Sequence, residues 1–314
     1  MRSWFRCALF RICMAVKSEP PYGKSLRGSW SAAVAALLAL CLAAGRTAVA
    51  ENLPVDLELA LAVDVSRSVD EEEARLQREG YIAAFRHPRV IEAIRHGPIG
   101  RIAVSYFEWG GYGNAHLVVD WTLIKDKANA DSFADALSRT VPMSARRTGI
   151  SGAIDYGAAL FDRNRFDGRR RVIDVSGDGA NNSGELVTVA RDRAVAAGIT
   201  INGLPILNGR ESPGGWRQIE NLDLYYRDCV IGGPGAFYIV AGDFRDFARA
   251  VLRKLILEIA GLQPPAADTR RAHAGGSATL FHRAADAPAA RRAAPPCEAG
   301  YRQFWRYFQG DDSP

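Results

Sequence analysis

The sequence predicts one doubly wound α/β domain whose sheet is mostly parallel and carries one antiparallel edge strand. Apolar runs typical of strands buried on both faces alternate with amphipathic helical segments between residues 54 and 261. One glycine-rich turn, residues 110–114, joins two strand-like runs directly, and strands joined so briefly pair antiparallel. The roughly 210 residues from 51 to 261 fit one such domain.

The predicted elements follow the chain in a regular order. A buried strand begins at residue 57, and residues 69–85 form a helix with an acidic first turn, where the helix dipole favours negative charge. The hairpin pairs a strand at 101–108 with one at 116–121. After it, helices and strands alternate, which indicates a doubly wound sheet. The helices are expected at 126–140, 150–161, 185–197 and 244–260, and the strands at 169–176, 199–207 and 236–241.

Residues 1–50 form a predicted signal peptide. A basic front precedes an apolar segment, residues 30–45, and a small-x-small pattern predicts cleavage after Ala50. The apolar segment is short for a transmembrane helix, and an uncleaved N-terminal anchor is the alternative. We therefore expect a periplasmic or secreted protein with no integral membrane span after cleavage.

Positive charge is concentrated in that leader. Its 50 residues hold seven Lys or Arg and one acid, whereas residues 51–314 hold 33 basic and 34 acidic residues. The predicted domain is therefore close to neutral. The formal charge of +5 on the whole chain gives no indication of a nucleic-acid partner, and none is expected.

The chain changes character after the predicted α/β domain, residues 51–261. Residues 262–300 are rich in Pro, Ala and Arg, which predicts a disordered linker. Residues 301–314 form an aromatic-rich C-terminal segment that either docks on a partner or membrane surface or packs back on the domain. Cys229 and Cys297 are the cysteines beyond the leader; an oxidising compartment lets them pair, and the sequence leaves the pairing open.

Oxygen-bearing side chains cluster where the first strand ends. Asp64, Ser66 and Ser68 form an Asp-x-Ser-x-Ser pattern. One carboxylate and two hydroxyls are hard donors, which suit Mg²⁺, Mn²⁺ or Ca²⁺ and suit zinc or copper poorly. The alternative is that both serines cap the following helix, because residues 68–71 resemble a capping box.

Two further segments supply oxygens for a divalent-cation site. A hard divalent cation takes about six oxygen ligands, more than three side chains supply. Thr148 lies in a polar loop that opens a helix, and Asp178 follows the strand at 169–176. Because the carboxyl ends of parallel strands share one edge of a sheet, both side chains are expected beside Asp64. Ser151 is an alternative or a support to Thr148.

With these pieces in this order, the chain resembles the von Willebrand factor type A (vWA) domains, Rossmann-like folds that carry a metal-ion-dependent adhesion site (MIDAS). The resemblance covers about residues 54–261. Residues 174–179 and 225–235 also look like a secreted bacterial branch of that superfamily, described only as a domain of unknown function (domain of unknown function 1194).

The resemblance implies a metal site and a mode of binding. The ligands would be Asp64, Ser66, Ser68, Thr148 and Asp178, and the cofactor a divalent cation, Mg²⁺ first, with Mn²⁺ or Ca²⁺ as alternatives. The cation would remain open to an acidic residue of a partner protein. The expected function is therefore cation-dependent protein–protein interaction or adhesion, with no catalytic residues.

Two other functions stay open. A metal-dependent hydrolase of the periplasm would use the same ion to activate water, and it needs a general base, for which Glu108 is the candidate. A structural envelope protein with a vestigial site would bind nothing. Glu108 and Trp109 are also expected to line the partner-binding face. Asp174, inside a predicted strand, needs a buried partner, either a neighbouring loop or the metal site.

Overall fold

The structure is a computed structural model that describes residues 52–208, 217–264 and 292–309. The predicted signal peptide and most of the predicted linker lie outside these ranges. Within the three ranges, no helix has both the length and the apolar character needed to cross a membrane.

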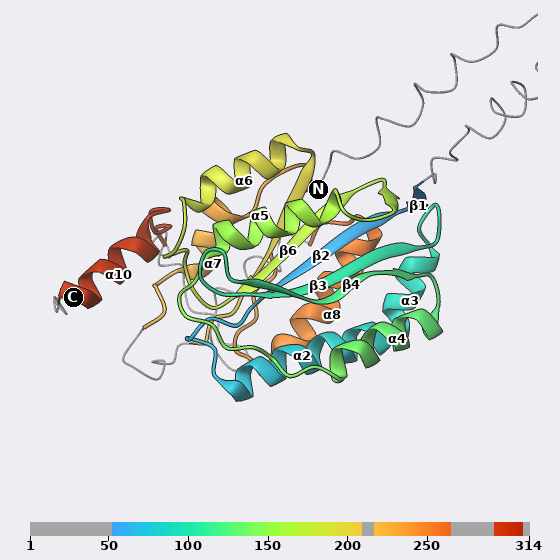
Figure 1. Ribbon diagram of the computed structural model, residues 1–314, viewed down its shortest axis with the longest axis horizontal. Helices are drawn as coiled ribbons and strands as arrows, with labels where there is room; N and C mark the ends of the chain where they lie inside the picture. Colours follow the sequence, from blue (N-terminus) through green and yellow to red (C-terminus); the bar gives the residue numbers. More distant parts are fainter. Residues whose placement is uncertain (1–51, 209–216, 265–291, 310–314) are drawn as a thin grey trace, which may run out of the picture. The chain divides into compact units, whose positions relative to one another are not determined.

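A five-stranded sheet forms the centre of the domain, in the order β4-β3-β2-β6-β7. Every neighbouring pair is parallel except β3 and β4, which form the antiparallel edge. The doubly wound fold with one antiparallel edge that the sequence predicted is therefore confirmed (Figure 1). The strands are β2 (Leu57–Asp64), β3 (Ile102–Trp109), β4 (Ala115–Ile124), β6 (Arg171–Gly177) and β7 (Ile199–Pro205).

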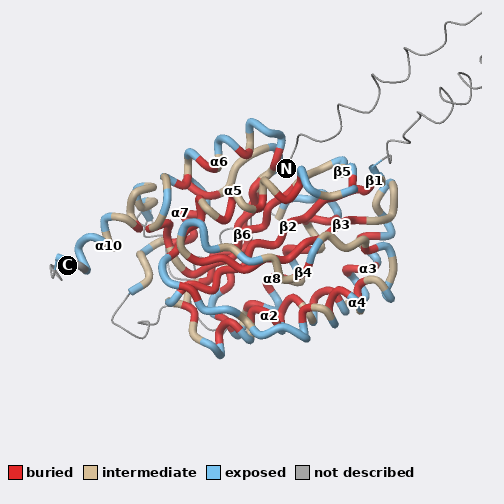
Figure 2. The backbone as a smooth tube through the Cα atoms, viewed as in Figure 1, coloured by how far each residue is buried: buried red, intermediate tan, exposed pale blue. Residues whose placement is uncertain are grey.

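Helices cover both faces of this sheet (Figures 1 and 2). Alternate residues along β2 divide between two hydrophobic cores, because successive strand side chains point to opposite faces. One core lies against α2 (Glu71–Arg86), α3 (Pro88–Arg95), α4 (Lys127–Ser138) and α8 (Phe247–Ala260). The other lies against α5 (Ile150–Phe161), α6 (Val187–Ala196), α7 (Leu222–Tyr225) and the π-helical turn η1 (Tyr226–Val230).

Two parts of the sheet region differ from the sequence prediction. Residues 236–241 do not form a strand; they pair with β7 and the residue after it only as isolated bridges, Gly203 with Tyr238 and Ile206 with Ala241. Positive φ angles at Gly233 and Gly235 turn the chain immediately before this segment. A small second sheet, missed by the sequence reading, pairs β1 (Leu53–Val55) with β5 (Phe166–Gly168) in parallel.

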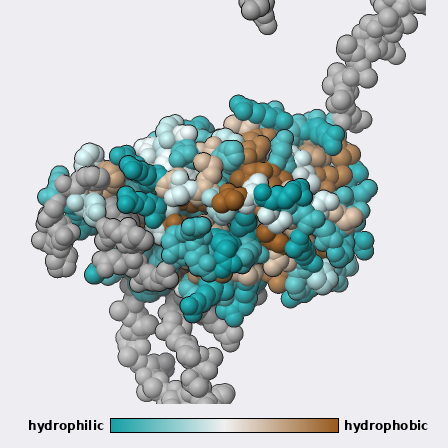
Figure 3. Space-filling model, turned by 60° about the horizontal axis from the view of Figure 1, so that its bottom comes forward, coloured by the Kyte–Doolittle hydropathy of each residue, from teal (hydrophilic) through white to brown (hydrophobic). Residues whose placement is uncertain are grey.

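The face of the domain drawn in Figure 3 is mostly polar. Hydrophilic residues cover much of the face in Figure 3, and hydrophobic residues gather in patches near its middle and upper part. Most of the large apolar side chains of the domain lie in the two cores, where Figure 2 shows the strands as buried.

The end of the described chain packs against the domain. The aromatic segment forms helix α10 (Ala299–Gln309), which begins within the last residues of the predicted linker. A disulfide joins Cys297, just before this helix, to Cys229 in η1. The pairing that the sequence left open is therefore present, and it closes a loop across a sequence separation of 68 residues.

Candidate metal centre

The five predicted ligands meet at the carboxyl edge of the sheet. Asp64 ends β2, Asp178 follows β6, and Thr148 lies just before α5. The Ser68 hydroxyl donates to Asp178 Oδ1 at 2.6 Å, and the Ser66 and Ser68 hydroxyl oxygens are 3.0 Å apart. The Thr148 hydroxyl lies 3.5 Å from the Ser66 hydroxyl. Side chains more than 80 residues apart in sequence thus form one connected oxygen cluster.

Asp64 is the deepest member of the cluster. Its side chain is fully buried, and Oδ1 accepts a hydrogen bond from the Ser66 N–H at 2.7 Å. Its second oxygen, Oδ2, has no hydrogen-bond partner among the described residues. Gly177 makes room for that oxygen, since a Cβ at position 177 would lie 2.8 Å from it. A buried, ionised carboxylate oxygen without a donor is costly, and either a proton on the carboxyl or a cation beside it removes that cost.

Burial raises the pKa values of both carboxyls in the cluster. Desolvation is the main cause for Asp64, whose pKa lies well above its ordinary value, and the neighbouring charge of Asp178 adds to the shift. Desolvation also raises the pKa of Asp178 to about 6, although the Ser68 hydroxyl opposes the shift. Two buried acids side by side resist ionisation, and a bound cation would remove that resistance.

The serines of the first loop do not cap the helix that follows. The N-cap of α2 is Asp70, whose side chain accepts from the Glu73 N–H while the Glu73 side chain accepts from the Asp70 N–H. The capping box therefore begins two residues later than the sequence alternative placed it. This arrangement leaves the hydroxyls of Ser66 and Ser68 directed into the oxygen cluster.

Several supporting residues escaped the sequence reading because they come from distant loops. The Asn182 side-chain oxygen accepts from the Thr148 N–H at 2.9 Å, and Asn208 Nδ2 donates to Asp178 Oδ2 at 3.1 Å. The Gln218 amide donates to the main-chain oxygen of Asp178 at 2.7 Å. These contacts fix the second and third loops of the cluster relative to each other.

Tyr226 is a further buried group at the cluster. A Cβ at position 177 would lie 3.0 Å from its hydroxyl and 2.8 Å from Asp64 Oδ2, so the two groups share one small space. Burial, followed by the charges of Asp64 and Asp178, raises the pKa of Tyr226 well above its ordinary value. The only sequence signal for this residue was its place in residues 225–235, one of the two stretches that carry the family resemblance.

Three other candidates form no side-chain hydrogen bond with the ligands of the cluster among the described residues. The Ser151 hydroxyl contacts the Ser183 carbonyl oxygen at 3.4 Å, and its N–H donates to the Asn181 side chain, so it supports the loop after Asp178. Glu108 and Trp109 do not line a surface, because they are only 2% and 1% exposed. The expectation that they face a partner was therefore wrong.

Glu108 is also engaged on both carboxylate oxygens. Oε1 forms a buried ion pair with Arg78 of α2, and Oε2 accepts from the Met143 N–H at 2.9 Å. Its β2 neighbour in the sheet is Val63, whose side chain lies in the core against α2, not on the side of Asp64. This geometry does not support Glu108 as a general base for water activation.

Asp174 finds a different partner from those that the sequence offered. Its Oδ1 lies 2.5 Å from Nζ of Lys254, which projects from α8 and is fully buried. Lys254 also lies 2.5 Å from Glu258 Oε1, and Asn202 donates to that same oxygen at 2.8 Å. Asp174 thus belongs to a polar network under α8, and neither a loop nor the metal cluster provides its counter-charge.

The residues of the cluster fit a hard divalent cation. Asp64 and Asp178 offer carboxylate oxygens, Ser66, Ser68 and Thr148 offer hydroxyls, and Asp64 Oδ2 is a buried oxygen with no hydrogen-bond partner among the described residues. All five donors are oxygen atoms, which Mg²⁺, Mn²⁺ and Ca²⁺ prefer to nitrogen or sulfur.

The strand order, the antiparallel edge and the position of this oxygen cluster define an α/β domain that resembles the vWA class. The chain belongs to the family described as "Protein of unknown function (DUF1194)", whose sequence model matches residues 54–263. No curated protein matches the sequence.

Solved structures show a remote likeness. A von Willebrand factor type A protein from Catenulispora acidiphila is 13% identical, with 66% of this chain and 43% of that chain covered and a TM-score of 0.45. The pilus adhesin SpaC from Lactobacillus rhamnosus GG is 14% identical, covering 66% and 30%, with a TM-score of 0.49. Proximal thread matrix protein 1 from the mussel byssus, with a zinc-occupied MIDAS motif, is 13% identical, covering 65% and 46%, with a TM-score of 0.45. The chain spans less than half the length of each, and likenesses of this size do not bear on what the site binds.

Proposed function

We propose that the protein is an exported binding protein that holds a divalent cation, Mg²⁺ first, at Asp64, Ser66, Ser68, Thr148 and Asp178. Through that cation it binds an acidic group of a partner protein. The observation that carries this proposal is the buried Asp64 Oδ2, which has no donor among the described residues and belongs to a cluster whose side chains offer only oxygen atoms.

The chemistry of the cluster favours binding over turnover. The five side chains supply fewer than the roughly six oxygens that a hard divalent cation takes, so the cation would keep a position that an acid of a partner could fill. A hydrolase would need a base beside the ion, and both oxygens of Glu108 are already engaged with Arg78 and Met143. Partner binding is therefore the better supported function.

Export is proposed on two grounds. The leader in residues 1–50 has the basic front, apolar segment and cleavage pattern of a signal peptide. The disulfide between Cys229 and Cys297 supports it, since disulfides persist in oxidising compartments and are rare in the cytosol.

Mg²⁺ should raise the melting temperature of the protein, and Asp64→Ala should abolish the rise. A cation that binds only the folded state stabilises it by about 2.7 kcal/mol at one hundred times its dissociation constant, roughly 5–10 °C for a domain of this size. Melting would be followed in EDTA and then with Mg²⁺, Mn²⁺ or Ca²⁺ added. In EDTA the variant should be at least as stable as the wild type, because the substitution removes a buried carboxylate with a raised pKa.

The matched control for that experiment is Asp167→Ala. Asp167 is an exposed carboxylate on β5, which pairs with β1 away from the oxygen cluster. This variant should keep the full cation-induced rise. No rise with any of the three ions in the wild type would contradict the metal site and leave a vestigial site in its place.

The cation effect should also depend on pH. The folded, cation-free protein holds a proton on Asp178 up to about pH 6, whereas an unfolded aspartate loses it near 3.8. A raised carboxyl pKa means that the cation-free fold loses stability as pH rises through this interval. Because a cation must displace the protons, the Mg²⁺-induced rise in melting temperature should be small at pH 5 and large at pH 7.5. An equal rise at both pH values would contradict ligation by these carboxylates.

A further inference from the structure

The C-terminal segment, residues 292–309, is fastened to the domain at separate points. Arg292 forms an ion pair with the fully buried Asp223 at 2.7 Å, and the disulfide at Cys297 follows five residues later. Gly300 then packs against the main chain of Asn181 so closely that a Cβ would lie 2.3 Å from the Asn181 oxygen. A covalent bond, a buried ion pair and a close backbone contact together define the position of this segment.

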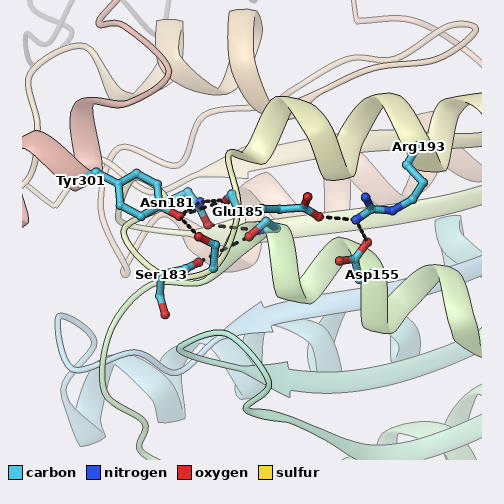
Figure 4. A network of polar contacts seen from close by, with 8 residues as sticks. Asp155, Asn181, Ser183, Glu185, Arg193 and Tyr301 are labelled. Atoms are coloured by element: carbon cyan, nitrogen blue, oxygen red, sulfur yellow. Dashed lines mark hydrogen bonds and ion pairs between the residues drawn. The ribbon is translucent and has the colours of Figure 1, made fainter.

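The first turn of α10 binds the loop that follows Asp178. The Tyr301 hydroxyl donates to the main-chain oxygens of Gly184 at 2.7 Å and Glu185 at 3.0 Å, and it accepts from Asn181 Nδ2 at 3.1 Å (Figure 4). The same Asn181 holds the Ser151 N–H, and its neighbour Asn182 holds the Thr148 N–H. The helix therefore rests directly on the loop that supports the proposed metal ligands.

Two further contacts place α10 at the rim of the proposed metal site. The Arg147 guanidinium lies over the Phe304 ring, 4.6 Å from its centroid, and Arg147 directly precedes Thr148. Gln303 Nε2 donates to the Arg217 main-chain oxygen at 2.5 Å, and the next residue, Gln218, binds the Asp178 main chain. The helix thus contacts segments beside both Thr148 and Asp178.

The exposed surface of this rim combines positive charge with aromatic rings. Helix α10 contains Arg302 and Arg306 and no acid, and Trp305 and Tyr307 are 60% and 47% exposed. Arg146 and Arg147 of the Thr148 loop are exposed as well. Tryptophan, tyrosine and arginine are the residue types that contribute most to binding at protein interfaces.

We infer that α10 and the Thr148 loop form one side of the partner-binding face, and that the partner offers an acidic segment instead of a single isolated carboxylate. This inference rests on the proposed function, since one acid of the segment would reach the cation. The arginines attract the remaining acids, and the aromatic rings of α10 cover the segment's apolar parts. The disulfide and Tyr301 hold this surface next to the metal site in the absence of a partner.

The test uses the full chain and a fluorescein-labelled synthetic peptide of alternating Asp and Gly residues, titrated in Mg²⁺ and in EDTA and followed by anisotropy. The double variant Arg302→Glu/Arg306→Glu should weaken binding in Mg²⁺ roughly tenfold, because it reverses two rim charges. Its Mg²⁺-induced melting shift should equal that of the wild type. Trp305→Ala should weaken the binding of an Asp-Trp peptide more than it weakens the binding of the Asp-Gly peptide.

The matched control is Arg89→Glu/Arg95→Glu, which reverses two exposed arginines on α3, a helix that contributes no residue to the oxygen cluster. This variant should bind the peptide as the wild type does. If both double variants lose binding equally, the effect of the α10 substitutions comes from net charge alone, and the inference is overturned.

The outcomes separate the two proposals. Binding lost in EDTA and in Asp64→Ala but unchanged in Arg302→Glu/Arg306→Glu would support the metal site and overturn the α10 surface. Binding that persists in EDTA and falls in the α10 variant would support the surface and contradict the metal-dependent function. A wild type that fails to bind the peptide in Mg²⁺, despite a cation-induced melting shift, would overturn the inference alone.

Discussion

Replacing Lys254 by methionine is expected to lower the free energy of unfolding by about 3–5 kcal/mol, the usual cost of removing one partner from a buried ion pair. Lys254 is fully buried, and its ammonium lies 2.5 Å from both Asp174 on β6 and Glu258 one turn further along α8. Methionine has a similar volume, so the loss should reflect charge and not a cavity.

The loss of unfolding free energy in Lys254→Met should be larger at higher pH. Burial, with the nearby charge of Asp174, raises the pKa of Glu258 to about 7, although Lys254 opposes the shift. Without the lysine, the fold would hold a proton on Glu258 more tightly than the unfolded chain does. The variant should therefore lose stability as pH rises above the ordinary carboxyl range, and its deficit should be larger at pH 8 than at pH 5.

Urea denaturation followed by circular dichroism would measure this deficit. Arg249→Met is the matched control, since Arg249 lies on the same helix, is 84% exposed and pairs with Asp246 at the surface. Exposed ion pairs contribute about 0–1 kcal/mol, so the control should differ little from the wild type. A deficit below about 1 kcal/mol for Lys254→Met would contradict the buried network as the link between α8 and the sheet.

Loss of the disulfide is expected to cost about 4 kcal/mol, because it closes a loop across 68 residues and so restricts the unfolded chain. Cys229→Ser/Cys297→Ser should therefore lower the melting temperature substantially. A reductant should lower the melting temperature of the wild type toward that of the double variant and leave the variant unchanged. If the reductant leaves the wild type unchanged, the bond is absent or without effect in solution.

The same double variant should affect the C-terminal segment more than the metal cluster. The ligands Asp64 and Ser66 reach their positions through β2, which the disulfide does not touch. The Mg²⁺-induced rise in melting temperature should therefore persist, whereas proteolysis between residues 292 and 309 should become faster. Loss of the Mg²⁺-induced rise in melting temperature would show that the disulfide also maintains the oxygen cluster.

The fold was predictable because it depends on local patterns. Helix α5 has the predicted bounds, 150–161, since its apolar stripe and the polar loop before it mark both ends. The strands β2 and β6 are apolar runs buried on both faces, a pattern that periodicity alone reveals. The strand prediction for residues 236–241 was wrong because it relied on apolar composition. Turns at the neighbouring glycines allow this segment to form only isolated bridges.

The site was predictable only in part. Asp64, Ser66 and Ser68 lie within five residues, so a short motif reveals them, and sheet topology brings Thr148 and Asp178 to the same edge. Whether these residues bind a cation remains a prediction. The supporting contacts depend on the paths of distant loops, which no local pattern encodes. The sequence therefore did not reveal the supporting positions of four residues, Asn182, Asn208, Gln218 and Tyr226.

The buried network under α8 did leave a signal in the sequence. Phe247, Ala250, Val251 and Leu255 mark the apolar stripe of the helix, and the two charged residues Lys254 and Glu258 fall on that same stripe. An acid inside the predicted strand at Asp174 completes the pattern. Charges of opposite sign on two apolar surfaces that must pack together predict a buried ion pair.

The first and last described residues lie at opposite ends of the sheet. The described residues begin beside the amino end of β2, whereas the oxygen cluster lies beyond its carboxyl end, eight residues or about 26 Å away, and α10 docks at that second end. A fusion partner or surface attachment placed before residue 52 would therefore leave the cluster facing outward. The same group placed after residue 309 would crowd the rim. Immobilised binding assays on this protein should accordingly be oriented through the amino end of the domain.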